Sequence, residues 1–204
     1  MCLRWLSQAE YSAYNTYVFN FLEGDVVYAA QRLLGCDIIR VIEDKPVKAR
    51  IVETEAYHQS DAASHSYRGK TKRNSVMFGK PGVAYVYFTY GMHYCMNIVT
   101  GKEGEASAVL IRAVEPIIGH EVMQKNRIGA NGVSLSNGPA KLCQAMKIDK
   151  TLNGHNLSQD PLRLIINPIL PVDKIQASTR IGISKEQQKP WRFYIKNNKF
   201  VSKK

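Results

Sequence analysis

The feature that most limits how this chain can fold is the segment VAYVYFTYGMHYCMN, residues 83–97. Its β-branched and aromatic residues favour an extended strand at residues 83–89. The pair Tyr90-Gly91 is a turn signal, and MHYCMNIV at residues 92–99 has the composition of a return strand. The segment therefore predicts a β-hairpin.

Side chains in a strand alternate between two faces, so we expect Tyr85 and Tyr87 on one face of this hairpin and Phe88 and Tyr90 on the other. A face packed on the core explains Phe88. It explains Tyr90 poorly, because a large ring at a hairpin tip has little of its own chain to pack against. Proteins that distort DNA from the minor groove insert such side chains, which also fill the gap left by a flipped nucleotide.

The segments around the hairpin predict a sheet with flanking helices. Asp25 is a plausible N-cap and Gly35 a C-terminal stop for a helix within residues 24–35. We expect further strands at residues 36–42, 47–57, 107–114, 161–167 and 190–196, and helices at residues 119–127 and from Pro139 onward. A turn at EDKP makes the first two strands a hairpin, and residues 58–82 form a long basic loop. The predicted fold class is α+β, with a curved and mostly antiparallel sheet.

Length and composition favour one intracellular domain. The 204 residues fit a single domain, for which we take residues 1–204. No apolar run approaches the ~20 residues of a membrane span, and the first residues lack the apolar stretch of a secretory signal. The four cysteines are too far apart for a CxxC motif. We therefore expect reduced thiols, no metal and no membrane, in the cytoplasm or nucleoid of a bacterium or the nucleus of a eukaryote.

The distribution of charge indicates a polyanionic partner. The formal net charge is +11, and no Asp or Glu occurs from Ala62 to Lys102 or from Gln187 to the end. In addition to its basic residues, the first of these stretches contains five tyrosines, all within residues 67–94. Basic side chains neutralise phosphates, and aromatic rings stack on bases. Nucleic acid is the favoured partner; a generally basic, solvated surface is the alternative.

The motif IVETEAY, residues 51–57, is where chemistry is most expected. Strand alternation would place Ile51, Glu53, Glu55 and Tyr57 on one face. On an exposed face these carboxylates would only be solvated charge. Near a basic surface, however, a carboxylate repels phosphate and is useful when a proton must be removed from water. The motif therefore favours catalysis by at least one of the two glutamates.

Several segments together resemble a known family of DNA repair enzymes. They are RLLG, IVETEAY, SHSYRGKTKRN, MFGKPGVAYVYFTYGMHYCMNIV, AVLIRAVEP, LSNGPAKLCQAMKI and PWRFYI, which run in family order from about residue 30 to 195. The sequence is similar to the alkyladenine, or 3-methyladenine, DNA glycosylases of the mammalian alkyladenine type. The resemblance implies a compact domain with a β-hairpin that enters the minor groove of damaged duplex DNA.

The resemblance also implies roles for individual residues. Glu55 is the general base, and Arg112 helps to position the attacking water. The flipped base lies between Tyr57 on one side and His65 and Tyr87 on the other, although a lone histidine such as His65 is more often structural. Residues implied in substrate and DNA binding also include the specificity residue Asn97, the wedge Tyr90 and its neighbour Met92, and the basic residues Arg68, Lys72, Arg73 and Lys141.

The expected activity is hydrolysis of the N-glycosidic bond of an alkylated or deaminated purine by a monomeric, monofunctional enzyme without a cofactor. Candidate lesions are 3-methyladenine, 7-methylguanine, hypoxanthine and ethenoadenine. One alternative is a nucleic-acid-binding protein without catalysis, which leaves Glu55 unexplained. The other is a carbohydrate hydrolase with Glu53 and Glu55 as its acid/base pair, which leaves the charge of +11 unexplained.

Overall fold

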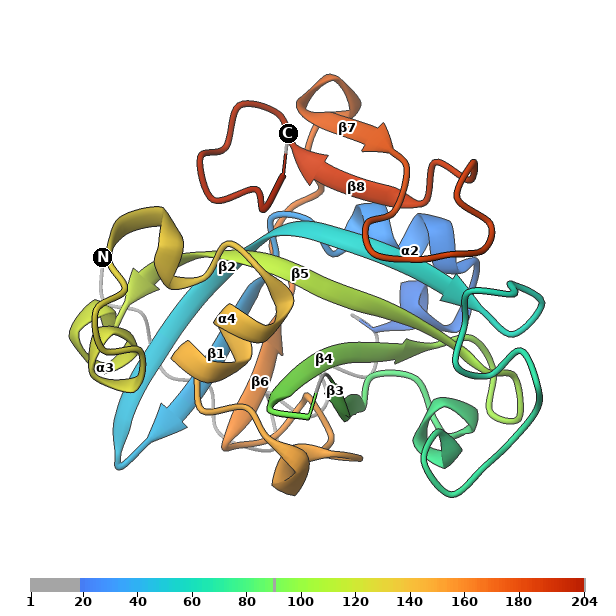
Figure 1. Cartoon of the computed structure of the whole chain (residues 1–204), viewed down its shortest axis with the longest axis horizontal. Helices are drawn as coiled ribbons and strands as arrows, with labels where there is room; N and C mark the ends of the chain where they lie inside the picture. Colours follow the sequence, from blue (N-terminus) through green and yellow to red (C-terminus); the bar gives the residue numbers. More distant parts are fainter. Residues whose placement is uncertain (1–18, 90, 204) are drawn as a thin grey trace.

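The chain folds around an antiparallel sheet that curls across the molecule (Figure 1). This computed structural model describes residues 19–89 and 91–203. The strand order is β3-β4-β5-β2-β1-β6, while β8 pairs with both β2 and β7. The strands are β1 (Asp37–Ile42), β2 (Lys45–His58), β3 (Ala84–Thr89), β4 (His93–Thr100), β5 (Ser107–Ile118), β6 (Leu162–Ile165), β7 (Ile175–Ser178) and β8 (Arg192–Ile195). The predicted single α+β domain with a curved antiparallel sheet is confirmed.

Short helices lie against this sheet. Helix α2 packs on β2, α4 packs on β4 and β5, and α3 packs on α4 (Figure 1). The α-helices are α2 (Val26–Arg32), α3 (His120–Asn126) and α4 (Pro139–Ala145). Single 3₁₀ turns are η1 (Asn20–Glu23), η2 (Ser75–Phe78), η3 (Gly132–Leu135), η4 (Lys150–Leu152) and η5 (Val172–Lys174). Within the described residues, none of these helices has the length and apolar character needed to cross a bilayer.

Local signals explain where the first elements begin and end. The Asp25 carboxylate accepts a hydrogen bond from the backbone N–H of Tyr28 at 2.7 Å, so it caps α2 as predicted. Gly35 has a φ of +82°, a left-handed conformation that glycine adopts without strain. Glu43 and Asp44 have φ of 49° and 62°, and together they turn β1 into β2. Two successive left-handed residues suit a tight hairpin, which confirms the predicted one.

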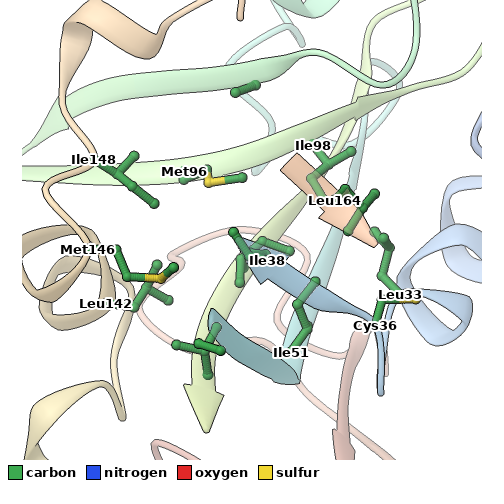
Figure 2. Close-up of a cluster of buried hydrophobic side chains, with 14 of the residues drawn as sticks. Leu33, Cys36, Ile38, Ile51, Met96, Ile98, Leu142, Met146, Ile148 and Leu164 are labelled. Atoms are coloured by element: carbon green, nitrogen blue, oxygen red, sulfur yellow. The ribbon is translucent and has the colours of Figure 1, made fainter. Parts of the chain in front are cut away.

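The main core joins side chains from the sheet and from both of its helical neighbours (Figure 2). Leu33 follows α2, Ile51 comes from β2, Met96 from β4 and Leu142 from α4, and all are fully buried. Truncating one such leucine to alanine typically costs about 2–5 kcal/mol of stability. This packing holds β2, β4 and β5 in fixed positions, and these are the strands that carry the candidate site.

Two of the three register shifts between β2 and β5 are bulges that change which side chains face this core. The pairing register passes over Val52 on β2 and Arg112 on β5. Before the bulges Ile51 lies in the main core; after them Ala56 does, so the core face changes from odd to even positions. Val52 instead packs with Ala113 and Phe200 in a separate cluster.

The expectation that Ile51 shares a face with Glu53, Glu55 and Tyr57 is therefore wrong, because the bulge adds one residue and reverses the alternation. The expectation that Phe88 packs on the core is also wrong: its side chain is 50% exposed, and its ring contacts that of Tyr94. Strand β7 was not predicted.

Candidate active site

A row of neighbouring residues crosses four strands and marks the site. In the register Tyr85 on β3 faces Asn97 on β4, Asn97 faces Leu110 on β5, and Leu110 faces Glu55 on β2. Tyr85, Asn97 and Leu110 line a cavity of about 470 Å³. A cavity of this volume is in the range that holds small organic groups.

Glu55 lies directly behind the cavity wall and has no exposed surface. Its Oε1 accepts the backbone N–H of Ile181 at 2.7 Å and lies 3.3 Å from Nη1 of Arg112; its Oε2 accepts the hydroxyl of Tyr57 at 2.8 Å. All three of these neighbours line the cavity. Burial raises the pKa of Glu55, and the partial compensation comes first from the charge of Arg112.

Glu53 has different surroundings although it is also fully buried. Its carboxylate accepts from Nε of Arg112 at 3.2 Å, Nη1 of Arg192 at 2.8 Å, the backbone N–H of Ser202 at 2.6 Å and the Ser202 hydroxyl at 2.9 Å. Three of these donors converge on Oε1, and Oε2 accepts only from the Ser202 N–H. Of the residues that contact Glu53 only Arg112 lines the cavity, whereas all three neighbours of Glu55 line it.

Aromatic rings form one wall of the cavity. Tyr85 and Tyr87 stack with their centroids 5.5 Å apart, and the His65 ring meets Tyr87 edge-on at 4.5 Å. Nδ1 of His65 lies 3.1 Å from the Tyr85 hydroxyl. Desolvation lowers the pKa of His65, and the charge of Arg73 lowers it further, so the ring is neutral at pH 7. Burial raises the pKa of Tyr85 to about 12.

A second part of the cavity wall comes from Tyr57 and from residues 181–185, which lie between β7 and β8. Tyr57 keeps its proton because burial raises its pKa, as does the neighbouring charge of Glu55. Between the walls, Nδ2 of Asn97 donates to the carbonyl of Tyr85 at 3.2 Å, and this bond orients the amide. The structure thus brings Tyr57, His65, Tyr87, Asn97 and Arg112 to one cavity, with Glu55 behind it.

Comparison with known proteins shows which family the chain belongs to. A family model described as "Methylpurine-DNA glycosylase (MPG)" matches residues 20–199. The chain belongs to the methylpurine-DNA glycosylase family. The family membership expected from the sequence motifs is therefore confirmed, and with it an enzyme class that acts on DNA.

Relatives of this DNA glycosylase occur in bacteria and archaea. A protein of Carboxydothermus hydrogenoformans is 53% identical over 90% of this chain and 97% of its own length. A protein of Methanoculleus marisnigri is 47% identical over 90% of this chain and 97% of its own length. A protein of Francisella tularensis is 49% identical over 86% of this chain and 93% of its own length. Each of the three is named "Putative 3-methyladenine DNA glycosylase".

The predicted DNA-contacting residues of this glycosylase surround the cavity to different degrees. Arg68, Lys72 and Arg73 are exposed on the loop between β2 and β3. Arg73 also lies 5.6 Å from the centroid of the Tyr87 ring. Met92 is 71% exposed near the start of β4, whereas Nζ of Lys141 on α4 donates to the Asn137 side chain at 2.8 Å. Tyr90 lies outside the described residues.

Sequence reasoning missed the segment that holds Glu55 from across the cavity. Ile181 supplies a backbone N–H, and the preceding Arg180 is buried against Asp61. A backbone donor has no residue-type signal, and neither hydrophobic periodicity nor a metal-type spacing marks this segment.

In the described part of the chain, Cys36, Cys95 and Cys143 are free and buried, and no group of three or more His, Cys, Asp or Glu residues could hold a metal ion.

Proposed function

We propose that this glycosylase rotates a damaged purine out of duplex DNA and hydrolyses its N-glycosidic bond with a water activated by Glu55. The observation that carries the proposal is the difference between the two buried glutamates. Arg192 and Ser202, which do not line the cavity, complete the surroundings of Glu53, while the three neighbours of Glu55 all line it. Glu55 is therefore the carboxylate that a water in this cavity can reach when one of these neighbours shifts.

The surroundings of Glu55 suit a general base. Its raised pKa makes it a stronger base than an exposed glutamate, while the charge of Arg112 favours its ionised form. Because Glu55 has no exposed surface in the free protein, the attacking water reaches it only after Tyr57 or Arg112 shifts when DNA binds. Side-chain changes of this size are common on binding. Deprotonated water then attacks C1′ of an oxocarbenium-like sugar.

The aromatic walls favour a cationic leaving group. A purine alkylated at N3 or N7 carries positive charge, which ring faces such as those of Tyr57 and Tyr87 attract. We propose 3-methyladenine and 7-methylguanine as such substrates. Hypoxanthine and ethenoadenine are neutral and would need protonation or a hydrogen bond at the leaving base. The Asn97 amide would disfavour the exocyclic amino group of normal guanine.

The outer residues would hold the DNA. Arg68, Lys72, Arg73 and Lys141 would contact phosphates, and the β3–β4 hairpin would enter the minor groove with Tyr90 as the wedge and Met92 beside it. This arrangement requires only one copy of the chain and no cofactor. Because the nucleophile is water and not an amine, the product is an abasic site, and borohydride should trap no covalent complex.

A Glu55→Gln variant tests the proposal. It should bind duplex DNA containing a methylated purine as tightly as the wild type and lose base release by about 10²–10⁴-fold, the usual contribution of a general base. Abasic sites are measured by alkaline cleavage of DNA carrying each of the four candidate lesions. Excision at the wild-type rate would show that Glu55 is not the base, and no excision by the wild type would favour a DNA-binding protein without catalysis.

The carbohydrate-hydrolase alternative receives no support from the site. It needs a second carboxyl group open to substrate, and Glu53 is enclosed by Arg112, Arg192 and Ser202. Activity on a neutral glycoside and none on damaged DNA would reverse this preference.

A further inference from the structure

A second buried ion pair connects the walls of the cavity. Arg180 and Asp61 have no exposed side-chain surface, and the guanidinium binds both carboxylate oxygens of Asp61, with Nη2 3.1 Å from Oδ1. Nη1 of Arg180 also donates to the carbonyl of Ala56 at 2.9 Å. One side chain thus joins the end of β2, the loop that leads to His65, and the segment after β7.

Both partners of this pair are directly connected to proposed site residues. The guanidinium carbon of Arg180 lies 4.6 Å from the centroid of the Tyr57 ring, and the next residue along the chain, Ile181, donates its N–H to Glu55. On the other side, Asp61 accepts the N–H of Ala63 at 3.1 Å, in the loop segment that lines the cavity. A bidentate pair restricts orientation as well as distance.

We propose that Arg180 and Asp61 are positioning residues that hold the Ile181 N–H on Glu55 and fix the separation of the two cavity walls. This inference rests on the proposed role of Glu55. The inference assigns the Arg180–Asp61 pair a function beyond stability. Without the pair, the segment after β7 would still be held by Arg192, which binds Ser178 and Thr179, but it would lose the contact next to Ile181.

The pair should therefore affect the ionisation of Glu55. The carboxylate of Glu55 is faced by Arg112 on β5, by Glu53 and Tyr57 on β2, and by the Ile181 N–H. Arg192 on β8 donates a hydrogen bond to Glu53 instead. A hydrogen bond to the charged form of a carboxyl lowers its pKa. If the Ile181 N–H moves away, the charged form loses a donor and the pKa rises.

The test compares Asp61→Asn with Asp37→Asn. Asp37 is a matched control, because it is 1% exposed and pairs with Lys48 at 2.8 Å and Arg50 at 3.2 Å without lining the cavity. The titration of Glu55 is followed by ¹³C NMR of the side-chain carboxyl in the DNA-free protein, with Glu55→Gln to assign its signal. Single-turnover excision of a methylated purine is followed over the same pH range.

We expect Asp61→Asn to move both the Glu55 titration and the acidic limb of the excision rate to higher pH, and to lower the rate at pH 7 by about tenfold, the usual effect of one hydrogen bond to a charged group. Asp37→Asn should move neither curve. Because removal of one partner of a buried pair can prevent folding, Arg180→Lys is a second variant: it keeps the charge without the bidentate geometry and should shift both curves in the same direction by less.

An unchanged Glu55 titration in folded Asp61→Asn and Arg180→Lys proteins would overturn the proposal and leave the pair a purely stabilising role, as would equal shifts in Asp37→Asn. The NMR titration does not depend on catalysis. If Glu55 is not the general base, the excision assay will show it with Glu55→Gln, and the titration will still report whether the pair positions the Ile181 N–H.

Discussion

Glu53 and Glu55 lie two positions apart on β2, on the same face, with full burial in common. Arg112 contacts both, through Nε to one and Nη1 to the other. The difference lies in the remaining donors: the tail residue Ser202 and Arg192 complete the shell of Glu53, while the cavity walls supply those of Glu55. At the scale of residues, the hydrogen-bond donors around each carboxylate therefore distinguish Glu53, which is enclosed, from Glu55, which contacts the cavity lining.

The ionised form of Glu55 should reduce stability. Its pKa is raised in the folded chain, so the stability that it contributes is present at low pH and is lost as the pH rises through the folded value. At pH 7 a Glu55→Gln protein should therefore have a Tm equal to or above that of the wild type, where 1 kcal/mol corresponds to about 2–4 °C for a chain of this size. Thermal unfolding by circular dichroism measures this. A large decrease in Tm would show that the ionised carboxylate stabilises the fold.

The same raised pKa predicts the pH dependence of excision. A general base works only when ionised, so the rate should fall on the acidic side at a pH above the ordinary glutamate pKa of about 4.3. Single-turnover rates with 7-methylguanine DNA are suitable, because this cationic base needs no protonation to leave. A rate that stays constant down to pH 4.5 would contradict the assignment of Glu55.

At the scale of elements, two irregular positions in one strand pair decide the layout of the site. The bulges at Val52 and Arg112 reverse the alternation of β2 and β5. As a result Ile51 and Ala56 both face the main core, and Glu53 and Glu55 point to the other side with Arg112 between them. In a strand without bulges, Ile51 would share a face with Glu53 and Glu55. Either Ile51 would then leave the main core or the glutamates would point into it.

The β3–β4 hairpin should separate stability from DNA binding along its length. Tyr85 is 1% exposed, so Tyr85→Ala should lower the free energy of unfolding by about 3–5 kcal/mol, as other buried aromatic truncations do. Tyr90→Ala should weaken binding and excision of lesion DNA while changing Tm little, if Tyr90 is the wedge that the family resemblance implies. Chemical denaturation and DNA titration measure the two effects. A large loss of stability in Tyr90→Ala would instead assign that residue to the core.

At the scale of the whole molecule, exposed basic residues lie on a loop that also lines the cavity. The formal net charge is +11, and exposed basic residues follow β2 on the loop that forms one side of the cavity. The same loop supplies His65 and Asp61, so exposed basic residues and cavity-lining residues belong to one segment. Glu43, in the turn before β2, pairs with Lys147 at 2.9 Å, and neither residue lines the cavity.

DNA affinity should accordingly depend strongly on salt. Each phosphate contact changes the slope of log K against log salt by about 0.9, so Arg68→Ala, Lys72→Ala or Arg73→Ala should each reduce the slope by roughly that amount. Lys147→Ala serves as the control and should leave it unchanged. Fluorescence anisotropy with undamaged duplex at several salt concentrations measures the slopes. Equal slopes for all variants would place the phosphate contacts elsewhere.

Much of the fold could be predicted because its signals are local. Asp25 and the turn at Glu43 and Asp44 act through a few neighbouring residues, and they set the start of α2 and the connection of β1 to β2 as expected, while α2 ends at Arg32, before the predicted stop Gly35. Strand β7 and the bulges could not be predicted in this way. Each exists because of a partner strand far away in the sequence, and β-strand preference itself depends on such neighbours.

The sequence by itself determined most of the elements of this protein, its basic character and its family, because composition, turn residues and long motifs are properties of the chain. It also indicated that at least one of Glu53 and Glu55 has a chemical role. Only the tertiary structure decided what surrounds each of them, since their donors come from β5, β8, the tail at Ser202 and the backbone of Ile181. Whether a buried carboxylate is enclosed or lies against the cavity lining depends on groups that packing brings together, and no spacing along the chain encodes them.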